Sequence, residues 1–349
     1  MENNSKGQKN GSGRTMLWVL LGLAVCTVVF MILLFPVFMT GAPREANIKI
    51  PAGATEKNVR DSLEKYFGNE YTDKVMNLVS LRDMDFSTRH GAYTIEKGTS
   101  PLTAMRKLTS GAQTPVKITI NGFRSLPKLI ERISAKMEFP EDSLRQVLQD
   151  PLVMKEYGLT PESAMALFID DTYLIYWNAT PRELVEKIGD NYKKIWNQQR
   201  TEKAEKLGVS PADLTIIASI TDEETNNKAE KGTIGRLYLN RVNKKMKLQA
   251  DPTVRFAIGD FTIKRVTKKD LQYQSPYNTY LNSGLPPGPI RTTSEATISA
   301  ILDSKPNDYL YMCAKEDFSG THNFATTYDE HMQNARRYQA ALDKRGITR

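Results

Sequence analysis

Residues 216–225 read IIASITDEET, an apolar helical run that ends in three acidic residues. At about 100° per residue, one apolar stripe of this helix includes a glutamate. The stripe consists of Leu214, Ile217, Ile220, Thr221 and Glu224. The same spacing of about 100° per residue places Asp222 and Glu223 outside this stripe. A carboxylate on an apolar stripe loses solvation, which raises its pKa and lets it hold a proton near neutral pH, as a general acid must.

The phase of this helix depends on where it begins. Residues 210–213 read SPAD, with Ser210 as N-cap, Pro211 at the first helical position and Asp213 closing a capping box. The competing interpretation of residues 222–224 is a solvated acidic cluster at a helix end, which the acidic run alone favours. Features elsewhere in the chain decide between the two.

The N-terminal part contains an apolar run, residues 16–39, with no charged residue inside it. About 20 such residues suffice to span a bilayer. Residues 1–15 carry three basic residues and one acidic residue, so we expect this tail to stay in the cytoplasm. The run is longer than the apolar region of a cleaved signal peptide. We therefore predict a single-pass anchor in the cell inner membrane, with everything after about residue 40 on its outer face.

Composition excludes several classes of protein. With 349 residues, 40% hydrophobic and 25% charged, the chain has room for an anchor and two or three folded units. The net charge of +8 favours an anionic lipid or polymer as partner. Nucleic acid is excluded by the topology and by the lack of a nucleic-acid-binding motif. Cys26 and Cys313 offer no intramolecular disulfide or CxxC pair, and the three histidines show no HExxH spacing, so we expect neither metal nor cofactor.

The pattern of the exported part indicates an α+β protein in three segments. Residues 46–115 predict a small module with short strands at 48–50 and 90–95 and two helices. Residues 116–207 form an intermediate α+β segment, with a strand at 116–120, a loop at 171–173 and one long charged helix from Pro181 to about Leu207. Residues 210–349 form the third unit, which closes with a helix from Tyr328 to about Lys344.

Five segments of the third unit occur in a fixed order between residues 218 and 290. They read ASIxxxET at 218–225, YLNR at 238–241, LQADPTV at 248–254, YNTY at 277–280 and GLPPGPI at 284–290. In these segments the chain resembles the membrane-anchored endolytic murein transglycosylases, the MltG or YceG-like family. Residues 50–54 and 91–95 resemble the LysM-like module of that family. The resemblance implies a LysM-like module followed by a mixed α+β, lysozyme-like catalytic domain.

The resemblance also implies an activity. Such enzymes are lyases that cleave nascent peptidoglycan strands between MurNAc and GlcNAc without water, leaving a 1,6-anhydro-MurNAc end and terminating strand elongation. One glutamate serves as acid and then as base, and only Glu224 matches the Glu-Thr or Glu-Ser pair of lysozyme-like transglycosylases. The implied partners are peptidoglycan strands, the membrane and peptidoglycan synthases.

The chain departs from the family pattern at three positions. Asp222 stands where family members commonly have a glutamate, which favours Glu224 over Asp222. Asp170 and Thr293 each stand where a proline is common. None of the three changes touches the chemistry expected of Glu224.

Several further residues are candidates for binding substrate. They are Gln249, Asp251, Tyr277, Asn278, Tyr280 and His322. Asp251 could lie opposite Glu224, which would make hydrolysis conceivable, or it could cap the helix begun by Pro252; the Asp-Pro pair favours the cap. Tyr280 could instead pack in the core, and a lone histidine such as His322 is more often structural.

Two competing functions stay open at this point. One is a non-catalytic, wall-binding scaffold for peptidoglycan synthases. The other is a hydrolytic muramidase, which usually needs a second carboxylate.

Overall fold

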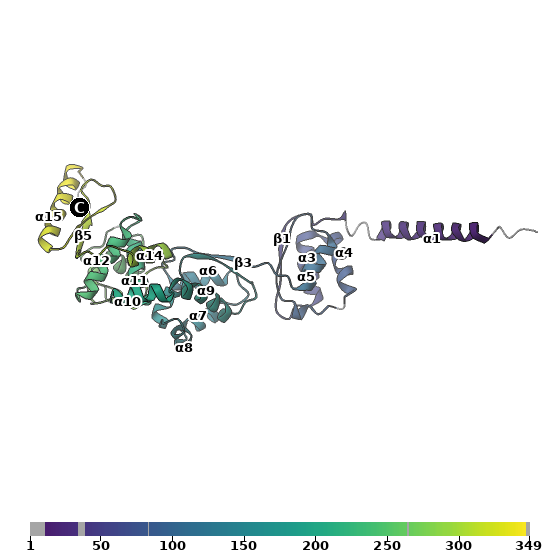
Figure 1. Cartoon of the computed structure of the whole chain (residues 1–349), viewed down its shortest axis with the longest axis horizontal. Coiled ribbons are helices and arrows are strands. Elements are labelled where there is room, and N and C mark those ends of the chain that lie inside the picture. The colour runs from purple at the N-terminus through teal and green to yellow at the C-terminus, as the bar shows by residue number, and fades with distance from the viewer. Residues whose placement is uncertain (1–10, 34–38, 83, 264, 347–349) are drawn as a thin grey trace, which may run out of the picture. The chain divides into compact units, whose positions relative to one another are not determined.

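The computed structural model describes the chain except residues 1–10, 34–38, 83, 264 and 347–349. It divides into two compact units: Met1–Val116 with Tyr176–Asn178, and Lys117–Ile175 with Ala179–Arg349 (Figure 1). Helices and two-stranded sheets occur in both, which confirms the mixed α+β class.

The first unit begins with α1 (Gly11–Leu33), the apolar helix expected from the sequence. Its segment Thr15–Ile32 has a mean hydropathy of 2.5 and no buried residue, so it is long and apolar enough to cross a membrane. The rest of the predicted anchor (residues 34–38) and most of the predicted cytoplasmic tail (residues 1–10) lie outside the described residues.

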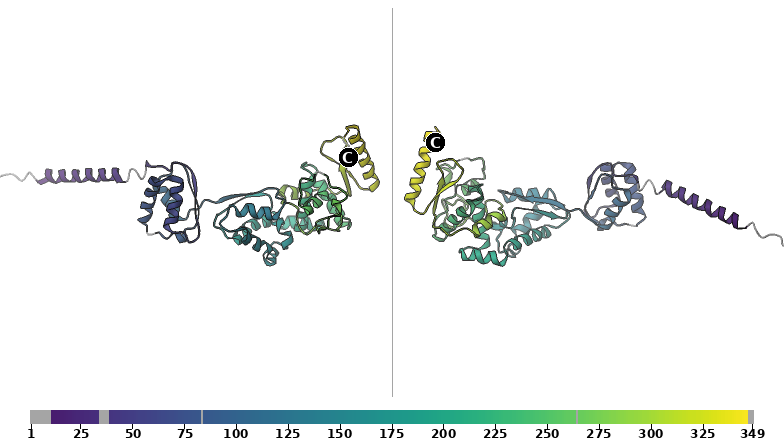
Figure 2. Two further views of the ribbon diagram at one scale, coloured as in Figure 1. Left: turned by 180° about the vertical axis from the view of Figure 1, so that it is seen from behind. Right: turned by 45° about the horizontal axis from the view of Figure 1, so that its top comes forward.

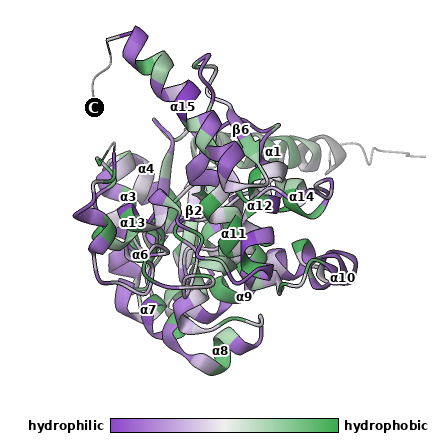
Figure 3. Ribbon diagram, turned by 90° about the vertical axis from the view of Figure 1, so that its left-hand side faces the viewer, coloured by the Kyte–Doolittle hydropathy of each residue, from purple (hydrophilic) through white to green (hydrophobic). Residues whose placement is uncertain are grey.

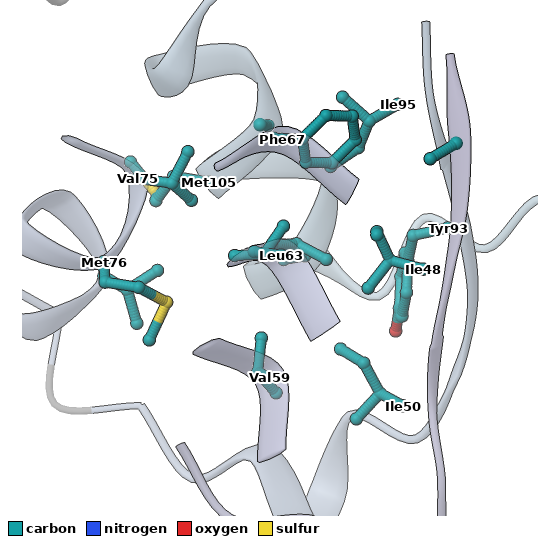
Figure 4. Packing of buried hydrophobic residues seen from close by; sticks show 14 of the residues in the cluster. Ile48, Ile50, Val59, Leu63, Phe67, Val75, Met76, Tyr93, Ile95 and Met105 are labelled. Atoms are coloured by element: carbon teal, nitrogen blue, oxygen red, sulfur yellow. The ribbon is translucent and has the colours of Figure 1, made fainter. Parts of the chain in front are cut away.

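The remainder of the first unit surrounds one apolar core (Figure 4). Strand β1 (Ala46–Ile50) pairs antiparallel with β2 (Gly91–Ile95), which confirms both predicted strands. The other elements are α3 (Glu56–Phe67), α4 (Asn69–Ser80), η1 (Phe86–Thr88) and α5 (Pro101–Ser110). Leu63 of α3 and Ile48 of β1 are fully buried in this core, because each element presents its apolar side to the centre.

Residues Tyr176–Asn178 belong to this first unit although they come some 60 residues later in the chain. Trp177 is buried, and the Lys49 ammonium lies 5.4 Å from the centre of its ring. The side-chain amide of Asn178 donates to the carbonyl of His90 at 3.1 Å.

The second unit opens with a sheet of β3 (Val116–Ile120) and β4 (Asp171–Ile175). The strand at 116–120 was predicted, whereas the predicted loop at 171–173 is wrong, because these residues pair with β3. Between the strands the chain is helical. The elements there are α6 (Leu126–Ser134), α7 (Glu141–Gln149), α8 (Pro151–Lys155) and η2 (Pro161–Leu167).

The long helix predicted from Pro181 to Leu207 is in fact two helices. Helix α9 (Pro181–Ile195) ends at Trp196, and Asn197 caps the start of α10 (Gln198–Lys206) through its side chain. An asparagine at the N-cap favours the start of a new helix, because its side chain accepts a backbone N–H of the first turn. Figure 3 shows the hydrophilic colouring of α10.

Helix α11 (Pro211–Glu224) forms the centre of the second unit. Ser210 and Asp213 form the predicted capping box. The prediction of a single apolar stripe is wrong, because residues 214–222 are all buried. Neighbouring helices α10, α12, α13 and α14 and the η2 turn contact α11, so the helix has no solvated face along most of its length.

The elements that follow α11 complete the unit. They are α12 (Lys231–Asn243), α13 (Asp251–Ile258), η3 (Asp270–Gln272), α14 (Glu295–Leu302), β5 (Tyr311–Ala314), β6 (His322–Ala325) and α15 (Tyr328–Lys344). Helix α12 approaches α14 through Gly232, where a Cβ would lie only 2.6 Å from the carbonyl oxygen of Ala300. Helix α15, which confirms the predicted closing helix, packs against the β5–β6 hairpin (Figure 2).

Candidate active site

Glu224 is the last residue of α11 and is partly buried. One of its carboxyl oxygens, Oε1, accepts a hydrogen bond of 2.7 Å from the Tyr238 hydroxyl on α12. Burial is the main cause that raises the pKa of Glu224, and the negative charge of Asp251 raises it further. The Tyr238 bond and the charges of His322 and Arg255 act in the opposite direction without cancelling the rise. The expected raised pKa is therefore present in the structure.

A pocket of about 190 Å³ opens in front of Glu224. It is lined by Glu224, Leu237, Tyr238, Arg241, Leu248, Gln249, Asp251 and Met312. Two of the predicted binding residues, Gln249 and Asp251, thus lie beside the glutamate, and both are exposed to solvent. An exposed rim over a partly buried carboxyl group is the arrangement that lets a bulky substrate reach a desolvated acid.

Gln249 has an unusual backbone, with φ at 50° in the left-handed region. Its N–H donates to the carbonyl of Thr279 at 3.2 Å, and the next residue, Ala250, donates to the Thr279 hydroxyl at 3.1 Å. Residues other than glycine hold this conformation where surrounding contacts enforce it, often beside functional sites. The contacts here hold the backbone of Gln249 at the rim of the pocket.

The prediction that Asp251 caps a helix is wrong. Helix α13 has Ala250 as its N-cap, without a side-chain cap bond, and Asp251 is its first residue. The Asp251 carboxylate instead accepts a 2.6 Å hydrogen bond from the Tyr280 hydroxyl. Burial is the main cause that raises the pKa of Tyr280, so the hydroxyl keeps its proton for this bond.

Tyr277 and Asn278 take part in the loop that precedes the Gly-Pro segment. Asn278 is fully buried, and its amide donates to the carbonyls of Leu271 and Tyr273 at 3.0 and 2.8 Å. The Tyr277 ring packs on Phe256, with 4.7 Å between ring centres. The Asn278 side chain therefore holds the loop that presents Tyr280, and it does not line the pocket.

His322 comes from the hairpin, on β6. Its Nδ1 lies 3.1 Å from a carboxylate oxygen of Glu230, the residue that precedes α12. The charge of His322 acts on the Glu224 carboxyl group. Glu224 and Asp251 therefore line one pocket from two elements, whereas His322 is not among the residues that line it.

The prediction that Asp222 and Glu223 point away from the core is wrong, since both side chains are buried. Asp222 accepts from Lys231 Nζ at 2.5 Å and from the hydroxyls of Thr293 and Thr297 at 2.5 and 2.7 Å. Because every one of these partners belongs to another segment, the sequence spacing carried no signal for them.

Glu223 is held by two arginines. Its side chain is 8% exposed and accepts from Arg124 at 2.7 Å and from Arg291 at 3.0 Å. Like Asp222, this carboxylate is already neutralised by strong donors. Among the described residues, the carboxyl group of Glu224 has only the neutral Tyr238 hydroxyl as a donor and has no directly bonded cation, unlike its two acidic neighbours.

The three positions that depart from the family pattern are neighbours in space. The Thr293 hydroxyl bonds to Asp222, and the Thr293 carbonyl accepts from the backbone N–H of Asp170 at 2.9 Å. Asp170 also accepts from Thr292 at 2.5 Å and from the N–H of Gly122 at 3.0 Å. Burial is the main cause that raises the pKa of Asp170. These residues form a hydrogen-bonded polar cluster at the C-terminal end of α11.

Within the described part of the chain, no three potential metal-ligating side chains gather at one point.

Residues 48–337 match the YceG-like family, which covers most of the chain. This protein belongs to the YceG-like family. A 2.6 Å crystal structure of a YceG-like protein from Listeria monocytogenes is similar in fold, with a TM-score of 0.54 and 24% sequence identity. That similarity covers 83% of this chain and 98% of the Listeria chain.

Two curated relatives share part of the sequence. The endolytic murein transglycosylase of Bacillus subtilis is 40% identical over 137 residues, which is 39% of this chain and 37% of the Bacillus protein. The endolytic murein transglycosylase of Streptococcus pneumoniae is 29% identical over 126 residues, 35% of this chain and 23% of that protein. The matched stretch thus spans about a third or less of each relative.

Proposed function

We propose that this YceG-like protein is an endolytic peptidoglycan lytic transglycosylase and that Glu224 is its catalytic acid and base. One observation carries the proposal: Glu224 is a carboxyl group with a raised pKa at a solvent-open pocket, and no cation among the described residues bonds to it directly. The two relatives named endolytic murein transglycosylases support the same reaction class.

We assign a separate task to each oxygen of Glu224, on the basis of its bond to Tyr238. Oε1 accepts the Tyr238 hydrogen bond and so acts as the carbonyl oxygen of the neutral acid, which leaves the proton on Oε2. Oε2 donates that proton to the leaving GlcNAc O4 as the glycosidic bond breaks. The resulting carboxylate is stabilised by the same Tyr238 hydroxyl.

No second protein carboxylate is required for the lytic reaction. The C6 hydroxyl of MurNAc supplies the attacking oxygen, and ring closure gives the 1,6-anhydro end without water. In the simplest scheme, Glu224 takes back the C6 proton and is restored for the next cycle. The MurNAc N-acetyl oxygen can stabilise the positive anomeric carbon.

The rim of the pocket supplies the substrate contacts. We assign binding of the glycan to Gln249 and to the Asp251–Tyr280 pair, with Tyr277 extending the surface beside them. Asn278 acts indirectly, by holding the loop of Tyr280 in place.

A muramidase is the second candidate, and the position of Asp251 is the observation that favours it. Asp251 lines the same pocket as Glu224, so it could serve as the second carboxylate of a hydrolase. Its bond to Tyr280 favours a binding role, because that carboxylate is already engaged. A non-catalytic scaffold, in contrast, gains nothing from a desolvated acid.

The remaining expectations concern the whole chain. We propose that α1 anchors the protein in the inner membrane with residues 1–15 in the cytoplasm, and that the second unit acts on its outer face. We also propose that the first unit is a LysM-like module and that the second contains a lysozyme-like catalytic region. Peptidoglycan synthases are the proposed protein partners.

The test uses the full-length protein in detergent and uncrosslinked glycan strands, with products identified by mass spectrometry. Wild-type protein should release 1,6-anhydro-MurNAc ends, and Glu224→Gln should lower that rate by at least about 10²-fold. Glu223→Gln serves as the matched control, since Glu223 is bonded to two arginines and is not at the pocket. Reducing MurNAc ends would establish the muramidase instead, and intact strands would leave only the scaffold.

A further inference from the structure

One basic side chain reaches the Glu224 pocket. Among the residues that line this pocket, Arg241 of α12 is the only cation. Arg241 is only 8% exposed, and burial is the main cause that lowers its pKa. A guanidinium nevertheless stays protonated in a protein. Because no carboxylate among the described residues bonds to it, the pocket contains a desolvated positive charge without a bonded anion.

Backbone carbonyls hold two of the three guanidinium nitrogens of Arg241. Nε donates to the carbonyl of Leu310 at 2.6 Å. Nη1 donates to the carbonyls of Leu248 and Lys247 at 2.6 and 3.4 Å. The guanidinium carbon also lies 5.4 Å from the centre of the Tyr311 ring. These contacts fix the plane of the guanidinium before any substrate binds, and such preorganisation lowers the entropy cost of binding.

The third guanidinium nitrogen, Nη2, is left for a ligand. Among the described residues no acceptor bonds to Nη2, and it is not one of the buried polar atoms that lack a partner, so it keeps contact with solvent. Since the other two nitrogens are bonded to the protein, Nη2 is the part of Arg241 that the pocket offers to a ligand. A fixed, charged donor of this kind bonds most strongly to a carboxylate or carbonyl oxygen.

The proposed reaction sets a requirement that such a donor meets. MurNAc and GlcNAc alternate along a glycan strand, and both carry an N-acetyl group. They differ at C3, where MurNAc alone carries a lactyl group. This group ends in an amide carbonyl on peptide-bearing strands and in a carboxylate on peptide-free strands. A site that breaks only the bond at C1 of MurNAc must therefore recognise the lactyl group, because the rest of the two rings is alike.

We propose that Arg241 is a specificity-determining residue, which donates from Nη2 to the carbonyl or carboxylate oxygen of the lactyl group and so places MurNAc, rather than GlcNAc, with its C1–O4 bond at Glu224. The inference rests on the proposed function and leaves both proton transfers to Glu224. Asp251, the other charged group of the pocket, accepts from the Tyr280 hydroxyl and would repel a lactyl carboxylate, so it is suited to sugar hydroxyls instead.

The experiment compares two peptide-free strands that differ only at the lactyl group. One strand keeps the lactyl carboxylate, and in the other this carboxylate is chemically reduced to an alcohol. Full-length protein in detergent is given each strand, and KM and kcat are measured from the release of anhydro ends. The wild-type KM should be at least about 10-fold lower for the carboxylate strand, because reduction removes one charge-assisted hydrogen bond.

Variants at position 241 assign this preference to one side chain. Arg241→Gln removes the charge, so the two strands should then give the same KM, through a rise in KM for the carboxylate strand alone. Arg241→Lys keeps the charge without the fixed donor geometry and should retain part of the preference. A merely structural role of Arg241 would weaken the activity on both strands alike and would keep their KM ratio. Arg236→Gln, the matched control on the same helix and outside the pocket lining, should keep the wild-type ratio.

An Arg241→Gln protein with the wild-type KM ratio would overturn the proposal while leaving the proposed function standing. If no variant at position 241 folds, the wild-type protein decides: the expected preference supports the proposal, and equal KM values for the two strands overturn it. Wild-type protein that releases no anhydro ends from either strand would refute the proposed function itself.

Discussion

Glu224 combines a desolvated position with a neutral hydrogen-bond donor. The Tyr238 hydroxyl stabilises the carboxylate form, so it lowers the pKa of Glu224 against the stronger effect of burial. The balance of these two effects decides the pH range over which the acid keeps its proton. Tyr238 is therefore the residue through which that range can be tested.

Tyr238→Phe removes the hydrogen bond and leaves the burial. The pKa of Glu224 should rise further, and since the reaction needs protonated Glu224, the alkaline limb of the rate should move to higher pH. Loss of one buried hydrogen bond should also lower the free energy of unfolding by about 1 kcal/mol. The rate is measured against pH, and stability is measured by urea unfolding. An alkaline limb that stays in place or moves to lower pH would contradict the assignment of Glu224 as the acid.

At the level of single residues, the sequence predicted the environment of Glu224 but not that of its neighbours. Counting along the helix predicted the capping box at Ser210 and a desolvated Glu224, but the single apolar stripe on which it relied is absent, because residues 214–222 are all buried. It misplaced Asp222 and Glu223, because their burial depends on cations and hydroxyls from distant segments. Arg124 and Arg291 are 99 and 68 residues away from Glu223, and no local pattern encodes such pairs.

At the level of elements, contacts of Asp222 with two other helices hold the C-terminal end of α11 in place. The Lys231 side chain, at the start of α12, is 18% exposed and pairs with Asp222, whose side chain is 5% exposed. Thr297 of α14 bonds to both members of the pair. Three helices thus meet at one buried carboxylate, two residues before Glu224.

Asp222→Asn should destabilise the protein by about 3 kcal/mol, because it leaves the Lys231 ammonium buried without a counter-charge. Adding Lys231→Met should recover a large part of that loss, since a buried ion pair is often replaced by uncharged side chains at little cost. Urea unfolding of the two single variants and the double variant measures the coupling. A single Asp222→Asn change within about 0.5 kcal/mol of the wild type would show that this pair does not fasten the helix.

Helices with strong caps and the strands β1, β2 and β3 were predicted, whereas β4 and the β5–β6 hairpin were not. The starts at Pro181, Pro211 and Tyr328 each follow a Ser or Thr cap with a capping box. The β5–β6 hairpin was missed because its four-residue strands are half-buried along their length and show no clean alternation. Without the hairpin, the sequence could name His322 as a candidate but could not pair it with Glu230.

At the level of the whole molecule, α1 differs from every other described helix, because its segment Thr15–Ile32 is long and apolar enough to cross a membrane and has no buried residue. Full-length protein should therefore remain with membranes after alkaline carbonate extraction, whereas a chain that starts at residue 40 should be released. With the proposed orientation, protease added outside spheroplasts should digest the part after residue 40. Release of the full-length chain by carbonate, or its protection from protease, would contradict the anchor or its orientation, respectively.

The return of Tyr176–Asn178 to the first unit has a consequence for biogenesis. A chain that crosses a membrane from its N-terminus delivers residues 46–116 first, yet the Trp177 side chain and the Asn178–His90 bond arrive only after a further 60 or so residues. The first unit must therefore wait, incomplete, while β3, α6, α7 and α8 emerge. In the proposed orientation, an export channel that stalls before residue 178 would therefore leave the first unit without the Trp177 side chain and the Asn178–His90 bond.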